Sequence, residues 1–214
     1  MLMEIIKMIF NADVFLYQLT SNYGNWIYLF LFLIIFSETG LVFLPFLPGD
    51  GLLFATGVLA VSSPLNPYIL ILVMVIAALL GSITNYHMGK YLGKKIIKRK
   101  IIKTAHLEKS KVFFHLHGKK AIILCRFMPY IRSIVPFFAG VSKMGKGDYL
   151  QYSLAGAILW VVSFVLLGFF LGQHPYVQSH FQYIVYAMMI SSWIPLIISS
   201  YKYLISQSFT TKTI

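Results

Sequence analysis

Four charged residues stand inside apolar stretches of this sequence. Glu38 and Asp50 are the only acids in those stretches, and Arg126 and Arg132 are the only arginines there. A charged side chain at the centre of a bilayer costs about 2.5–3.5 kcal/mol on insertion scales, so four of them call for a function. Planar guanidinium groups suit phosphate oxygens, and carboxylates held out of water can accept protons. The set predicts one polar site that binds phosphate and couples its movement to protons.

The same residues have a structural interpretation, in which buried ion pairs between arginine and carboxylate only hold two segments together. Hydrophobic residues usually stabilise a protein interior as well as such pairs or better. Stability alone therefore explains the set poorly. The two interpretations are compatible in different states of one transporter.

Prolines and glycines interrupt the chain around these charges. Residues 45–51 (PFLPGDG) cannot continue a helix, and the apolar run that follows is too short to cross a bilayer. This predicts a re-entrant hairpin at about 45–63, with an ordinary loop between spans as the alternative. Two arginines and two prolines predict a second hairpin at about 121–144. We expect the hairpin backbone and hinges to include Pro45, Pro48, Gly49, Gly51, Pro129, Pro136 and Gly140.

The composition predicts lipid as the solvent. Apolar residues make up 58% of the chain and charged residues 11%, against about 25% charged in a soluble domain. The expected fold is an all-α integral membrane protein with about four full transmembrane helices and two opposed re-entrant hairpins, which form an inverted repeat. We expect the full spans at Trp26 to about Leu44, Pro67 to about Met88, Tyr149–Gly172 and Phe181 to about Ile205.

Basic residues set the expected topology. Eleven of the 18 lysines and arginines lie between Lys90 and Lys120, and none lies in 38–89 or 147–201. This is typical of a cytoplasmic loop beside anionic lipid and not of a nucleic-acid surface. With four spans, both termini are then cytoplasmic. Around the transmembrane domain at 25–205 we expect a short amphipathic interfacial helix in 1–24 and a cytoplasmic tail at 206–214.

The other reactive side chains predict no metal and no cofactor. His115 and His117 are two positions apart, which suits one helix face poorly, and no acid or cysteine accompanies the six histidines at metal-ligand spacing. Cys125 is the single cysteine and cannot form an internal disulfide. The sequence also has no visible Ser-His-Asp set, so we do not expect an enzyme.

Several motifs resemble those of the DedA family, over about residues 25–205. The most specific is R-F-x-P-x-x-R-x-x-x-P-x-x-A-G at 126–140. The others are E-x-G at 38–40 with F-L-P-G-D-x-L-L at 46–53, then Gly81, Tyr86, Gly89-Lys90 and Gly93, and finally Gly156, Trp160 and Gly168. The resemblance is closest to the YqjA/YghB-type bacterial membrane proteins. One departure is Ser82, where many members carry an acid.

The resemblance implies opposed re-entrant hairpins and a role in membrane homeostasis that depends on the proton gradient. Some members recycle undecaprenyl phosphate across the bacterial inner membrane, and others move phospholipids. The family's essential residues match Glu38, Asp50, Arg126 and Arg132.

We therefore expect a flippase of the bacterial inner membrane for undecaprenyl phosphate or a phospholipid, coupled to protons. Arg126 and Arg132 would bind the phosphate, and Glu38 and Asp50 would couple protons. The expected partners are membrane lipids and protons; a homodimer is compatible with the sequence but not specified by it. The alternatives are a proton-driven antiporter of small cations or cationic drugs, a non-transporting membrane assembly protein, and an enzyme acting on lipid phosphates.

Overall fold

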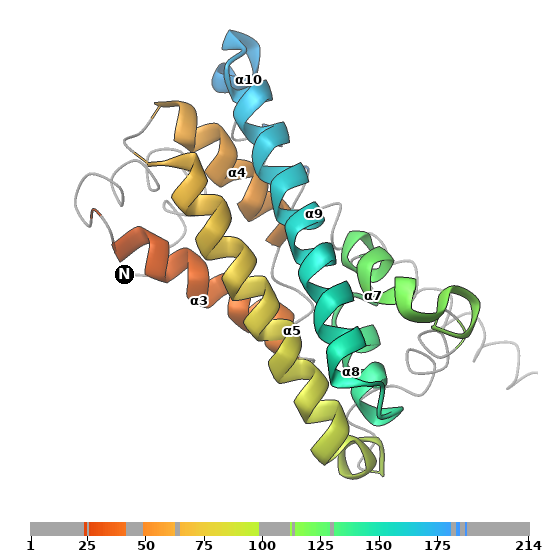
Figure 1. Ribbon diagram of the computed structural model, residues 1–214. Coiled ribbons are helices and arrows are strands. Elements are labelled where there is room, and N and C mark those ends of the chain that lie inside the picture. Colours follow the sequence, from red (N-terminus) through yellow and green to blue (C-terminus); the bar gives the residue numbers. More distant parts are fainter. Residues whose placement is uncertain are drawn as a thin grey trace, which may run out of the picture.

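Two long antiparallel helices form the centre of the protein (Figure 1). The computed structural model describes residues 24, 26–41, 49–62, 65–98, 112, 114–128, 131–180, 183–184 and 187, which contain helices and turns but no strand. Within them, α5 (Pro67–Lys98) and α9 (Lys146–Gly172) are long and apolar enough to cross a membrane. They contain the second and third spans that the sequence predicts.

The first predicted span is a shorter helix. α3 (Trp26–Gly40) has 15 residues, which at about 1.5 Å per residue give about 22 Å, less than a hydrocarbon core of about 30 Å. Residues 42–48, the fourth span except for 183, 184 and 187, the segment 1–23 and the tail 206–214 lie outside the described residues. Four full spans, the interfacial helix and the cytoplasmic tail therefore stay predictions.

The two segments expected to form hairpins are built from separate short helices. α4 (Gly49–Ser62) begins the described part of the first, with Gly51 buried in its first turn. The second is divided into α7 (Ala121–Leu124), the 3-10 turn η2 (Cys125–Phe127) and α8 (Ile134–Val141). Pro136 is accommodated in the first turn of α8, where backbone N–H groups lack helical partners. The described residues do not include Pro45, Pro48 or Pro129, and the re-entrant placement stays a prediction.

Each short helix crosses one long helix at a pair of glycines. α4 packs along α9, and α8 packs along α5, toward opposite ends of the central pair (Figure 1). Gly57 and Gly168 meet at the first crossing, and Gly89 and Gly140 meet at the second. At all four positions an added Cβ would clash with a backbone carbonyl oxygen of the opposing helix. Each half of the chain thus packs its short helix on the long helix of the other half. The inverted repeat itself stays a prediction.

The basic segment begins as helix. The residues from Lys90 to Lys98, expected in a loop, continue α5, and 99–111 lie outside the described residues. Further on, the 3-10 turn η1 (Gly118–Lys120) lies close to the start of α9, where Lys119 forms an ion pair with Asp148 at 2.6 Å. This hydrogen bond raises the pKa of Lys119. A short helix, α10 (Pro175–Ser179), follows α9.

Two apolar clusters divide the interior along the central helices. Along α5, the first cluster ends at Ala78 and the second contains Tyr86; along α9, Tyr149 belongs to the second and Ala157 to the first. The site described below lies between them. Many large apolar side chains point outward, among them Leu72, Leu159 and Phe170. An outer surface of this kind fits lipid better than water.

Candidate functional site

Three of the four predicted charges meet where α3 ends, α4 begins and the turn before α8 lies. Arg132, in that turn, donates from Nη1 to Asp50 Oδ1 at 3.0 Å and from Nη2 to Glu38 Oε1. Glu38 is fully buried, Arg132 is nearly so, and the Asp50 side chain is 17% exposed. One guanidinium therefore holds both carboxylates, which come from the segments that lead into and out of residues 42–48.

Glu38 also fixes the start of α4. Its Oε1 accepts the backbone N–H of Gly49 at 3.0 Å, so the carboxylate satisfies a helix N-terminus and gains from the helix dipole. Glycine at position 49 leaves room for this contact, because an added Cβ would displace the Glu38 carboxylate. Glu38 Oε2 is buried and has no hydrogen-bond partner in the part of the chain that the structure describes. A proton on Oε2 would consequently leave both hydrogen bonds at Oε1 in place.

Trp160 of α9 completes the surroundings of Asp50. Its indole Nε1 donates to Asp50 Oδ1 at 2.8 Å, and its ring lies 5.7 Å from Arg132 Cζ, within cation–π range. From the sequence, Trp160 was identified only as part of a family motif. Because a buried indole N–H almost always requires an acceptor, a tryptophan in an apolar span was an available signal for a polar partner.

Arg126 has a different set of partners from Arg132. Its Nη2 donates to the hydroxyls of Ser82 at 2.7 Å and Ser153 at 3.3 Å, and to the carbonyls of Ala78 and Ser153, both at 3.4 Å. Among the described residues, no carboxylate contacts this guanidinium, although it is 5% exposed. Both carboxylates thus pair with Arg132, and neither pairs with Arg126.

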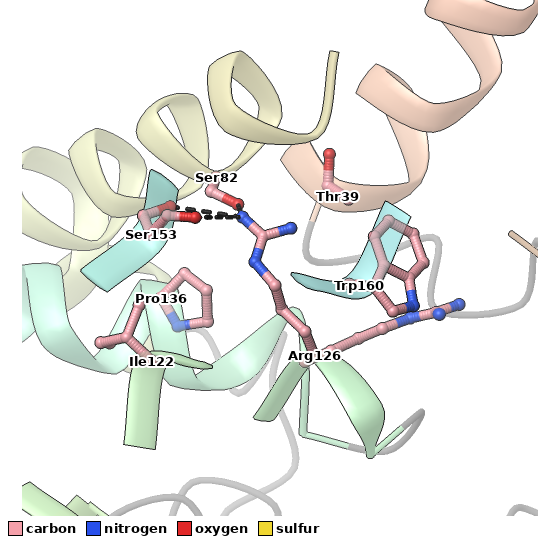
Figure 2. A pocket seen from close by; sticks show the side chains of 8 residues that line it. Thr39, Ser82, Ile122, Arg126, Pro136, Ser153 and Trp160 are labelled. Carbon is pink, nitrogen blue, oxygen red and sulfur yellow. Dashed lines mark hydrogen bonds between the residues drawn. The ribbon is translucent and has the colours of Figure 1, made fainter. Parts of the chain in front are cut away.

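The two arginines nevertheless line one small cavity. Figure 2 shows Arg126 reaching toward Ser82 and Ser153, with Trp160 across the cavity. The cavity measures about 10 Å³, close to the smallest volume that holds a single water. A phosphate group does not fit, so the structure represents a closed and ion-paired state. The complete lining is Thr39, Ser82, Ile122, Arg126, Arg132, Pro136, Ser153 and Trp160.

Asn85 is a buried residue of the site that was not predicted from the sequence. Its Nδ2 donates to the carbonyl of Thr39 at 3.2 Å and to the carbonyl of Ser133 at 2.6 Å. These two residues directly follow Glu38 and Arg132. Asn85 therefore holds the backbone on both sides of the ion pair. The available signal was its spacing: Asn85 lies seven residues after Ala78 and three after Ser82, which puts it on the same face of an apolar helix.

The site has no cluster of metal ligands among the described residues. Its chemistry is that of two guanidinium groups, two carboxylates, hydroxyls and an amide, which can bind an oxyanion and exchange protons. None of these groups is arranged as a nucleophile with its base.

Comparison with known proteins agrees with this architecture. The VTT domain model matches residues 47–170, which include α4, α5, α7, α8 and all of α9 except its last two residues. The chain belongs to the VTT-domain, or DedA, family of membrane proteins. This confirms the family that the motifs predict.

Three relatives illustrate the range of similarity. Protein DedA of Escherichia coli K12 is 40% identical over 196 residues, which cover 89% of this chain and 90% of the relative. An uncharacterized membrane protein of Mycobacterium leprae is 36% identical over 183 residues, 84% of this chain and 82% of the relative. The inner membrane protein YqjA of Escherichia coli K12 is 33% identical over 152 residues, 70% of this chain and 69% of the relative. No solved structure matches this chain.

Proposed function

We propose that this DedA-family protein moves an anionic lipid phosphate, either undecaprenyl phosphate or a phospholipid, across the bacterial inner membrane in exchange for proton movement. The observation that carries the proposal is the capture of buried Arg132 by Glu38 and Asp50, beside a second arginine on the same cavity. Arginine pairs suit phosphate oxygens. Carboxylates that take up protons can release such an arginine to an anion.

Charge balance gives the cycle its order. In the closed state two carboxylates and two guanidinium groups sum to zero, which limits the cost of burial. An arriving phosphate adds negative charge. Protonation of Glu38 or Asp50 removes one negative charge, so a site loaded with a singly charged phosphodiester stays neutral. A phosphomonoester dianion requires protonation of both carboxylates. The cavity must widen to admit the head group, and the close glycine crossings of α4 and α8 are the contacts along which these helices would shift.

The location and topology belong to the same proposal. YqjA carries the description inner membrane protein, and the distribution of lysines and arginines favours cytoplasmic termini. The single cysteine, Cys125, is fully buried, so introduced cysteines can be labelled over a low background. A membrane-impermeant thiol reagent should label Gln173→Cys in spheroplasts, where the outer side is accessible, and Thr213→Cys in everted vesicles, where the cytoplasmic side is accessible. The reverse pattern would invert the topology.

The direct test is lipid translocation by the purified chain in proteoliposomes. We expect transport of undecaprenyl phosphate or phosphatidylglycerol that responds to a pH gradient. It should be lost in Asp50→Asn and strongly reduced in Arg132→Lys, because Lys cannot reproduce two directed bonds to two carboxylates. Gly147→Ala serves as the control, since an added Cβ there meets nothing within 4 Å.

Other outcomes would assign other functions. Lipid transport that is equal in the parent and in both site variants would refute these roles. Cation-dependent collapse of a pH gradient in everted vesicles, without lipid movement, would indicate an antiporter. Full complementation of a deletion strain by a transport-dead variant would indicate an assembly role, and release of inorganic phosphate would indicate an enzyme.

A further inference from the structure

The two buried arginines differ in the free energy needed to separate each guanidinium from its present partners so that it can bind an anion. Arg132 is held by two carboxylates, and releasing it separates opposite charges in a buried site. Arg126 is held through Nη2 alone by two serine hydroxyls and two carbonyl oxygens, all of them neutral. Hydrogen bonds between charged groups are stronger than those to neutral acceptors. An anion therefore competes more easily for Arg126 than for Arg132.

Arg126 also keeps unused donors beside the cavity. A guanidinium has five N–H donors, and the hydrogen bonds among the described residues all leave from Nη2. The N–H groups of Nη1 and Nε are thus left for a ligand. The Ser82 hydroxyl donates to the Ala78 carbonyl at 2.8 Å, and rotation about its Cβ–Oγ bond would direct that donor to a ligand instead. The result is one buried positive charge, on a residue that is 5% exposed, with no contacting carboxylate among the residues that the structure describes.

We infer that Arg126, Ser82 and Ser153 form a separate anion subsite that engages a phosphate group first, without proton uptake, before Arg132 is released from Glu38 and Asp50. The inference rests on the proposed function and adds an order to it. The ligand chemistry is a phosphodiester or phosphomonoester oxyanion, from a lipid head group or free in solution. In the closed state the cavity holds only a water-sized occupant, so entry requires η2 to move away from α9.

Gly156 marks the contact where that movement occurs. An added Cβ at Gly156 of α9 would lie 3.1 Å from Arg126 Cδ and 3.2 Å from its Nε. The arginine side chain therefore runs directly against the α9 backbone. A Cβ at this position would also lie 3.1 Å from Ile123 Cα, so both the Arg126 side chain and the backbone before η2 would have to shift by a few tenths of an ångström.

The test measures anion binding at equilibrium, with no transport step. The full chain is purified in dodecyl maltoside, which carries no phosphate, and its thermal unfolding is followed with dimethyl phosphate or dihexanoyl phosphatidylglycerol. Both phosphodiesters keep one charge across the pH range used. At mildly alkaline pH, where the carboxylates stay paired with Arg132, one or both ligands should raise the unfolding temperature of the parent. The ligand that does so identifies free head group or lipid as the source.

Two variants locate the effect. Arg126→Gln should lower ligand affinity at least about tenfold, and it should fold as well as the parent because it removes a buried charge without a contacting carboxylate. Ser82→Asp places a carboxylate where the Ser82 hydroxyl meets Nη2. It should lose binding by a larger factor than Ser82→Asn, which has the same shape without the charge.

Equal ligand stabilisation of the parent and Arg126→Gln would overturn the inference. Equal binding by Ser82→Asp and Ser82→Asn would also overturn it, as would binding by the parent only at acidic pH. Lipid transport with any of these results would leave the proposed function standing and remove only the order of engagement. Binding through Arg126 without lipid transport would support the Arg126 subsite and refute the proposed function.

Discussion

Replacing Asn85 tests whether the backbone clamp around the ion pair is needed. Asn85→Leu keeps the volume of the side chain and removes both N–H donations, to the carbonyls of Thr39 and Ser133. Thr39 lies in the last turn of α3, where carbonyl groups lack helical partners. The substitution therefore leaves at least this carbonyl buried without a donor from the described residues.

The expected loss follows from the two hydrogen bonds. A hydrogen bond contributes about 0.5–1.5 kcal/mol net, and interhelical bonds within a bilayer average about 0.6 kcal/mol. Two of them give about 1–3 kcal/mol. The unpartnered Oδ1 of Asn85 disappears with the amide and returns part of that loss. For a chain of this size about 1 kcal/mol corresponds to about 2–4 °C, so we expect the unfolding temperature to fall by about 2–10 °C.

The assay compares thermal unfolding in detergent with lipid translocation in proteoliposomes. Asn85→Leu should lower both, because Thr39 and Ser133 directly follow Glu38 and Arg132. Thr84→Val is the matched control: its hydroxyl bonds only the Leu80 carbonyl of its own helix, and its stability should stay within about 0.5 kcal/mol of the parent. Parent-like stability and transport in Asn85→Leu would refute the clamp.

Three further changes have defined outcomes. Gly57→Ala should destabilise the chain by about 1–3 kcal/mol through overpacking at the α4–α9 crossing, whereas Gly147→Ala should not; equal unfolding temperatures would contradict the tight crossing. Trp160→Phe keeps an aromatic side chain but loses the N–H that donates to Asp50, and it should lower the transport rate about tenfold. An unchanged rate would show that this hydrogen bond has no role in transport. Lys119→Met should leave the unfolding temperature unchanged in neutral buffer with salt, because exposed pairs contribute little. Because the pKa of Lys119 is raised, any stabilisation by the pair is present below pH 10.5 and is lost only as the pH rises further. A difference in unfolding temperature between Lys119→Met and the parent at neutral pH that vanishes below pH 10.5 would contradict this.

Much of the architecture was readable from residue types alone. Long runs without charge predicted α5 and α9, since about 20 consecutive apolar residues suit a helix that crosses a bilayer. Proline and glycine predicted the interruption of the segment that contains Pro136, because proline removes a donor and clashes inside a helix. The charges inside apolar stretches predicted one site that holds Glu38, Asp50, Arg126 and Arg132, because lone charges in lipid are costly. In the structure three of them are in direct contact, and Arg126 lines the same cavity.

Helix ends and hydrogen-bond partners were less accessible. α5 continues through Lys98, although the sequence suggested a loop from Lys90, because lysines are good helix formers and charge alone does not end a helix. The role of Asn85 was missed, since an amide has no charge and its partners are carbonyls of distant segments.

By itself the sequence determined that the chain suits a membrane, that proline and glycine interrupt its apolar segments at two places, and that four charged groups stand inside those segments. These properties follow from transfer energies and backbone sterics, which act residue by residue. The tertiary structure decided that both carboxylates belong to Arg132 and that Arg126 rests on serines. That division depends on which helices cross at Gly57 and Gly140 and at what distance, and such geometry is a property of packed pairs and not of single residues.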